Sequence, residues 1–409
     1  NGDLFSNFGY KTIRPFFSRR IGLGVPIQAG IRLSGNIDEN WRIGLMDIQT
    51  RSDEILNTAA ENFGVVSLQR KVFDRSNVSL IFINKQAVKL NENQINQSQY
   101  NRNIGLEYNY FSSDNLWNSK LMFLKSLSPI KQKQGEVFAS HIEYQSTRWK
   151  WKLQQEYITG NYSAEVGFIP RNNYIKIQAT VGHLTYTKKN TSLLSHGPSI
   201  ERTYYFDTDF NKKDQAEQFD YLFNFKNRSR FSIGIRRQYI ELLSDFDPLR
   251  TNISSLFAGS THQWNSYKIK YNSKPQNRFT YSTELLTGGY YEKGKRTAFL
   301  GEFGYRFQPI LELNSVINYN QIELPAPWNE NSFWLLGLKA NLTLTNKIFF
   351  SNLFQYNEQL GLWNFNSRFQ WRYKPASDMF LVFNSNEIIV PKVSRGWSLT
   401  LKVNYWLNL

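Results

Sequence analysis

Four histidines are the side chains best suited to acid–base chemistry or metal binding in this chain: His141, His183, His196 and His262. None stands at a metal-ligand spacing from another histidine, and the chain has no cysteine for a thiolate site. No serine elbow and no His-Glu-x-x-His run occurs. His141 and His183 fall within predicted strands near their ends. We interpret such lone histidines as girdle or lumen residues, and we expect no enzyme activity and no metal.

A glycine pair and two acidic runs are the other candidate ligand sites. Gly288-Gly289-Tyr290-Tyr291 lacks the Lys-Ser/Thr ending of a phosphate-binding loop. The acidic runs at 207–214 and 245–247 lack the ligand spacing of a defined calcium loop. We interpret all three as solvated loops, so the sequence predicts no cofactor.

Charged residues alternate with apolar residues along most of the chain, which carries a formal net charge of +16. In the last segment Leu399, Leu401 and Val403 alternate with Thr400 and Lys402. Because successive strand residues point to opposite faces, such a segment forms a strand with one apolar and one polar face. Nucleic-acid binding would need basic and aromatic residues on the same surface, so we expect no nucleic-acid partner.

About 21 such segments run from Val25 to the C-terminus, which is the periodicity of strands. The chain is 16% aromatic, and no window holds 18 consecutive apolar residues that could form a membrane helix. A membrane β-strand needs only about 9–11 residues with one apolar face. The pattern therefore predicts an all-β fold, a transmembrane antiparallel up-and-down β-barrel of about 20–22 strands.

The connections between these segments alternate in length. Short ones fall near residues 36–39, 73–76, 112–115, 145–148, 226–229, 273–276, 307–309, 345–347 and 374–378. Long ones fall near residues 51–61, 89–99, 128–136, 160–173, 242–261, 288–295, 322–331 and 388–395. Short periplasmic turns and longer extracellular loops are typical of bacterial outer-membrane barrels. Two joints break the rule, since 188–195 is too long for its side and 358–360 too short.

A soluble β-propeller or pair of sandwiches is the alternative fold. Such proteins bury Val, Ile and Leu in packed cores and lack a two-sided difference in loop length. Here the apolar face is rich in Tyr, Trp and Phe near strand ends, as expected of interfacial aromatic girdles.

Residues 1–24 fit the alternation poorly, and Pro15 interrupts the stretch from Tyr10 to Ile21. We expect this N-terminal segment to be a lumen plug or an extra strand, and residues 25–409 to form the barrel. The chain starts at Asn1, which indicates a processed form or the C-terminal part of something longer.

Basic residues dominate the predicted polar face, where only Glu107, Glu156 and Glu302 oppose them in the cleanest strands. A charge facing lipid at mid-depth costs about 2–4 kcal/mol, so these residues should face water or a partner. We expect them to line an electropositive lumen; the alternatives are contacts with an acidic plug or with lipopolysaccharide headgroups. The candidate lumen-lining residues are Arg32, Lys150, Lys152, Lys176, Arg236, Lys268, Lys270, Arg306, Lys339, Arg368, Arg372 and Lys402.

Four stretches resemble a barrel family of Bacteroidota outer membranes: residues 15–22, 43–50, 165–171 and 369–382. The resemblance spans essentially the whole chain. It implies a bacterial outer-membrane location and a barrel of unassigned function that usually follows a carbohydrate-binding-type N-terminal β-sandwich. That sandwich is not in these residues.

The preferred function is passage of polar, anionic or sugar-like solutes across the outer membrane by a porin-like barrel. A second hypothesis is a plugged barrel that anchors another domain or belongs to a larger outer-membrane assembly, and a third is an outer-membrane hydrolase. The expected partners are outer-membrane lipid and lipopolysaccharide, a polar or anionic solute, and an N-terminal periplasmic domain or other outer-membrane proteins.

Overall fold

The computed structural model describes residues 4–23, 25–53, 57–89, 99–129, 134–188, 191–251, 254–388 and 394–406. They form one sheet of 22 strands, in which consecutive strands pair antiparallel. The short β10 is the exception, since it pairs with β11, which also pairs with β9. This confirms the predicted all-β fold and its strand number. No helix among the described residues is long and apolar enough to span a membrane.

The strands, and three single-turn 3-10 helices, have the following bounds: η1 (Ser18–Arg20), β1 (Ile27–Asn36), β2 (Trp41–Thr50), β3 (Ala60–Val72), β4 (Ser76–Lys89), β5 (Tyr100–Phe111), β6 (Trp117–Leu127), β7 (Gly135–Gln145), β8 (Trp149–Ile158), β9 (Tyr174–His183), β10 (Thr185–Tyr186), β11 (Leu193–Phe206), β12 (Lys212–Phe225), β13 (Arg230–Glu241), β14 (Thr261–Asn272), β15 (Phe279–Gly289), η3 (Tyr291–Lys293), β16 (Lys295–Phe307), β17 (Leu311–Glu323), β18 (Glu330–Thr343), β19 (Ile348–Asn357), η4 (Glu358–Leu360), β20 (Leu362–Lys374), β21 (Ser377–Ile388) and β22 (Ser394–Val403).

Tight turns and longer connections alternate along the meander, as the sequence predicted. Residues 73–75 join β3 to β4, whereas residues 159–173 join β8 to β9. Turn chemistry accounts for the tight joints: before β6, Asn115 has a positive φ of 61°, and the Asp114 carboxylate accepts a hydrogen bond from the Leu116 amide at 3.0 Å. The short β10 ends just before the first irregular joint, and η4 forms the second.

The chain divides into two compact units. Unit 1 comprises residues 1–183 and 201–215, and unit 2 comprises 184–200 and 216–409. In each unit large apolar side chains such as Leu106, Phe123, Ile269 and Leu338 are exposed on one sheet face. Directly opposed residues of an antiparallel pair share a face, so this apolar face is continuous from strand to strand within each unit.

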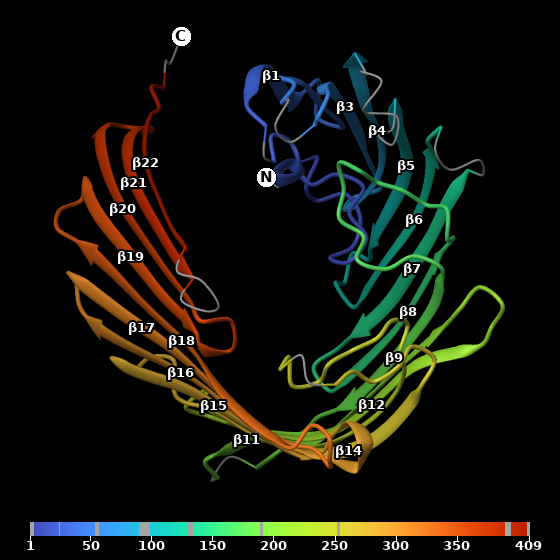
Figure 1. Cartoon of the computed structure of the whole chain (residues 1–409), viewed down its shortest axis with the longest axis vertical. Helices are drawn as coiled ribbons and strands as arrows, with labels where there is room; N and C mark the ends of the chain where they lie inside the picture. Colours follow the sequence, from blue (N-terminus) through green and yellow to red (C-terminus); the bar gives the residue numbers. More distant parts are fainter. Residues whose placement is uncertain are drawn as a thin grey trace. The chain divides into compact units, whose positions relative to one another are not determined.

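The main hydrophobic core lies on the other face of the sheet in unit 1. Residues 4–23 make no strand of the sheet and run across this face as a coil (Figure 1). Phe5, Phe8, Ile13 and Phe16 from the coil are buried there among strand residues such as Ile81. Apolar side chains of β2 to β4 and of β6 to β9 on this face thus pack on a segment of the same chain.

Candidate functional site

The register places the candidate basic residues on one face in each unit. In unit 1, Arg32 lies opposite the core residue Met46, and Lys176 lies opposite Glu156 in the strand that also carries Lys150 and Lys152. These four occupy the face that carries the main core, here called the polar face of unit 1. In unit 2 an unbroken chain of pairings from β13 to β22 puts the other eight on a single face, here called the polar face of unit 2.

Most of these cations have partners. Arg32 lies over the Phe5 ring at 5.0 Å from its centroid. Ion pairs join Lys150 to Glu143 (3.6 Å), Lys176 to Glu156 (3.1 Å), Lys268 to Asp220 (2.8 Å), Lys270 to Glu284 (3.0 Å) and Arg372 to Asp378 (3.4 Å). Arg236 donates to the Gln218 amide oxygen at 3.1 Å, and Arg306 donates to the carbonyl oxygens of Pro275 and Asn277.

Four of the twelve have no ion pair or hydrogen bond within the described ranges: Lys152, Lys339, Arg368 and Lys402. Three of them lie on β18, β20 and β22 of unit 2. The uncompensated positive charge is therefore more local than the sequence count predicted. Strand alternation and register place Glu61, Glu143, Asp220, Glu284, Glu312 and Asp378 on the polar faces as well.

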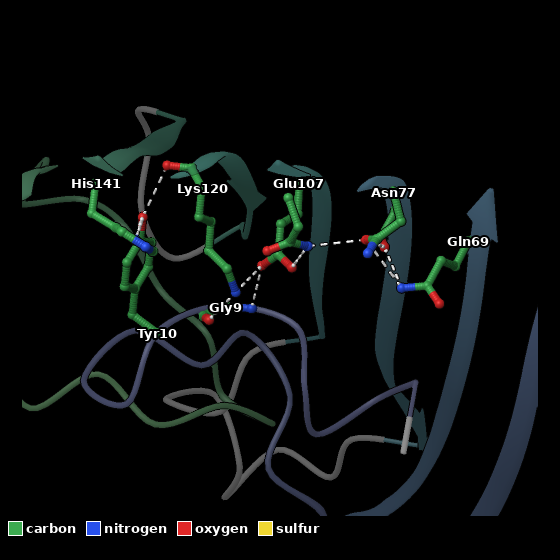
Figure 2. A network of polar contacts seen from close by, with 9 residues as sticks. Gly9, Tyr10, Gln69, Asn77, Glu107, Lys120 and His141 are labelled. Carbon is green, nitrogen blue, oxygen red and sulfur yellow. Dashed lines mark hydrogen bonds and ion pairs between the residues drawn. The ribbon is translucent and has the colours of Figure 1, made fainter. Parts of the chain in front are cut away.

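The N-terminal coil is held to the polar face of unit 1 by an ion pair that also binds backbone (Figure 2). The Glu107 carboxylate accepts a hydrogen bond from the Gly9 amide at 2.7 Å and pairs with the Lys120 ammonium at 3.1 Å. Lys120 donates in turn to the Gly9 carbonyl oxygen at 2.9 Å. The Gly9 N–H and C=O groups are thus bound by a carboxylate and an ammonium that are themselves paired.

Further polar contacts extend this network along the face (Figure 2). The Tyr10 hydroxyl donates to the Lys120 carbonyl oxygen at 3.2 Å and lies 3.3 Å from the His141 Nδ1 atom. The second Glu107 oxygen accepts from Asn109 at 2.7 Å, and Asn109 also donates to Asn77 at 3.0 Å. Burial, together with the negative charge of Glu107, raises the pKa of the Tyr10 phenol, so its hydroxyl stays protonated.

The connection between β8 and β9 completes the cover of unit 1. The Arg14 and Phe168 backbones exchange two hydrogen bonds, at 3.1 and 2.8 Å, and the Phe17 amide donates to the Val166 carbonyl at 2.7 Å. Tyr162 of this connection is fully buried, which raises the pKa of its phenol. The N-terminal coil and residues 159–173 therefore form one layer, here called the inner cover.

A partly buried ion triad fastens the inner cover to the strands. The Lys85 ammonium on β4 lies 2.7 Å from the Glu61 carboxylate and 2.8 Å from the Glu165 carboxylate of the cover. Lys85 and Glu61 were absent from the sequence-based candidates. Both stand at inward positions of alternating strands, so a cross-strand search for opposite charges would have found that pair, but not Glu165.

The comparisons with known proteins agree with this architecture. Residues 28–360 match the family described as a domain of unknown function, DUF5916. The chain belongs to this family. No curated protein matches its sequence.

Among solved structures, this DUF5916 chain is similar to the siderophore receptor PirA from Pseudomonas aeruginosa, at 8% identity and a TM-score of 0.53, with 91% of this chain and 75% of that chain covered. It is likewise similar to the closed form of the ferric-catecholate import receptor Fiu from E. coli K12, at 8% identity and a TM-score of 0.50, covering 91% and 78%. The DUF5916 chain thus has the fold of outer-membrane receptor barrels.

One polar cluster of the DUF5916 chain resembles a hydrolytic triad by distance. In unit 2 the Ser260 hydroxyl lies 2.9 Å from the His262 Nε2 atom, and the Glu292 carboxylate lies 3.2 Å from Nδ1. However, the Ser260 hydroxyl donates to the Phe257 carbonyl oxygen at 2.6 Å, which directs its proton away from the imidazole. The cluster therefore joins Ser260, in the connection before β14, to Glu292 of η3 through His262.

The other histidines have aromatic or amide partners. His183 packs on Trp149 with ring centroids 4.4 Å apart, and His196 lies 2.6 Å from the Tyr221 hydroxyl. His141 lies 3.0 Å from the Asn118 amide oxygen. The described residues contain no cluster of three His, Asp or Glu side chains able to hold a metal ion.

Proposed function

We propose that this DUF5916 chain is an outer-membrane transport barrel that passes polar, anionic or sugar-like solutes along the polar face of unit 2. The observation that carries the proposal is the separation of the two faces. Exposed Ile, Leu and aromatic side chains form one face, and the candidate basic residues all lie on the other.

The energetic cost of burying charge decides which face contacts lipid and which contacts water. Each Lys or Arg placed against the bilayer midplane costs about 2–4 kcal/mol, so a polar face with many charges requires water. A large exposed apolar face is stable only against lipid or another apolar surface. We therefore assign the apolar face to the lipid of the outer membrane, where lipopolysaccharide is the expected neighbour, and the polar face to a lumen.

Within that lumen the two polar faces would differ in role. The inner cover occupies the polar face of unit 1, and the strand cations there are largely paired. Among the residues that the structure describes, Lys339, Arg368 and Lys402 have no ion pair or hydrogen bond on the polar face of unit 2. Unpaired cations raise the local concentration of anions, so we place the solute path along unit 2.

Recordings of the purified protein in planar bilayers under a KCl gradient test this function. We expect a reversal potential that indicates chloride preference at 0.1 M salt, where the Debye length is about 10 Å. The preference should shrink at 1 M, where it is about 3 Å. Cation preference, or anion preference that does not depend on salt, would contradict an electropositive lumen.

The packing of the inner cover favours a second candidate, a plugged barrel that anchors an N-terminal domain or belongs to a larger assembly. Phe5, Phe8 and Ile13 are almost fully buried, as in a permanent core. Absence of conductance, both in the natural chain and in variants that loosen the cover, would favour the anchor. The Bacteroidota source and the N-terminal β-sandwich implied by the sequence resemblance belong to the same proposal.

A further inference from the structure

A pocket of about 570 Å³ lies on unit 2 over β17 to β20, within the size range of small-molecule sites. Gly337 creates its floor. In the register this glycine lies between Val316 and Gln355, and a Cβ atom on it would meet nothing nearer than the Val316 Cβ atom at 3.7 Å. The missing side chain, rather than a distorted backbone, thus opens the pocket on the polar face.

The lining combines two kinds of side chain. Leu335, Leu353 and Leu362 supply aliphatic surface, and Gln355 and Asn364 supply amides. The Asn364 NH₂ group donates one hydrogen bond to the Gln355 amide oxygen at 3.4 Å. The Gln355 NH₂ group, the Asn364 oxygen and the second Asn364 N–H remain for neighbouring hydroxyl groups, while aliphatic surface suits the C–H faces of a sugar ring. This composition favours a hydroxylated ring over a hydrocarbon or a bare inorganic ion.

One cation contributes charge to the pocket. Lys339 is part of the lining, lies opposite Asn314 and Leu353, and has no ion pair or hydrogen bond within the described parts of the chain. The nearest acid in the register, Glu312, is opposite Asn341 and accepts a hydrogen bond from it at 3.2 Å. Lys339 is therefore available to a carboxylate.

We propose that this pocket is a binding site for an anionic saccharide of one or two rings, whose carboxylate pairs with Lys339 and whose hydroxyls bind the amides. The site rests on the proposed function, because it lies on the proposed solute path, and it narrows the solute to acidic sugars.

The test is calorimetric titration of the whole protein in detergent with lactobionate, a disaccharide carrying one carboxylate, and with lactose, its neutral counterpart. Lactobionate should bind at least about tenfold more tightly than lactose, because a charge-assisted hydrogen bond contributes at least that factor. Lys339→Met should abolish the difference. Lys402→Gln, which removes an unpaired cation of the same face outside the pocket, should preserve it.

Two glycine-to-leucine substitutions distinguish binding in the pocket from nonspecific attraction to the charge of the polar face. Gly337→Leu should fill the pocket and weaken both sugars, whereas Gly396→Leu on β22 should not, since a Cβ atom there meets nothing within 4 Å. Circular dichroism would verify that each variant folds. Equal affinity for the two sugars, or lactobionate binding unchanged by both Lys339→Met and Gly337→Leu, would overturn the site.

The experiments can refute the binding site and the transport function separately. A conducting, anion-selective barrel that does not discriminate lactobionate from lactose would refute the site and leave the proposed function standing. Selective lactobionate binding without conductance would uphold the site and refute transport.

Discussion

Glu107→Gln is the sharpest test of how the inner cover is held. The carboxylate of Glu107 is 3% exposed and its partner Lys120 is 16% exposed, so the pair is largely shielded from solvent screening. One glutamine oxygen cannot serve the Gly9 amide, Lys120 and Asn109 together, and the glutamine NH₂ group would face donors. Removing one member of a buried ion pair costs about 3–5 kcal/mol.

We expect this loss to act locally, because Glu107 is the main polar contact of the coil around Gly9. A cost of about 3 kcal/mol corresponds to about a hundredfold faster opening of the segment. Hydrogen exchange measured by mass spectrometry should show that acceleration in peptides from residues 4–23, including the Tyr10 and Ile13 amides that bond each other's carbonyls. Strand peptides of β13 to β22 should keep their protection.

Glu302→Gln is the matched control, since Glu302 is exposed on the polar face of unit 2 and makes no hydrogen bond or ion pair with the inner cover of unit 1 within the described residues. It should leave exchange of residues 4–23 unchanged. If Glu107→Gln accelerates exchange less than about threefold, or accelerates it equally in all strands, the ion pair does not hold the cover as argued.

Three further outcomes are expected. Leu401→Arg should impair assembly into lipid bilayers by about 2–4 kcal/mol, because Leu401 is 63% exposed on the apolar face, whereas Lys402→Gln should assemble normally; equal yields of folded protein would refute the face assignment. Arg368→Gln should lower chloride selectivity in bilayer recordings more than Arg372→Gln, which removes a charge already paired with a carboxylate, and the reverse order would contradict the pairing. Hydrogen bonds from the Asn211 side chain and from the backbone amides of Asn211 and Asp209 lower the pKa of Asp207 from its ordinary 3.8. The ionised carboxylate therefore stabilises the turn above pH 3.8, and this stabilisation is lost as the pH falls through the lowered pKa. The ratio of pepsin cleavage within 207–211 in the natural chain to that in Asp207→Asn should therefore rise from about pH 4 to about pH 2, since the protease's own pH dependence cancels in the ratio.

The sequence by itself determined the strands and their faces. Alternation with a period of two is a local property, so Leu401 and Lys402 could be assigned to opposite faces without knowing which strand lies beside them. Turn residues such as Asn115 are equally local, which is why the alternation of short and long connections was predictable. The candidate basic residues follow from the same rule and share one face in each unit.

Only the tertiary structure decided which charges are neutralised and what covers them. Whether a lysine is paired depends on the register of the neighbouring strand, as with Lys268 and Asp220, which are 48 positions apart in sequence. Gly9 contacts Glu107, and Glu165 contacts Lys85. Each contact joins an irregular segment to a strand, and the course of an irregular segment cannot be predicted from the alternation of residues. Faces are set by the alternation of one strand, whereas partners are set by the distance between chain segments in the folded sheet.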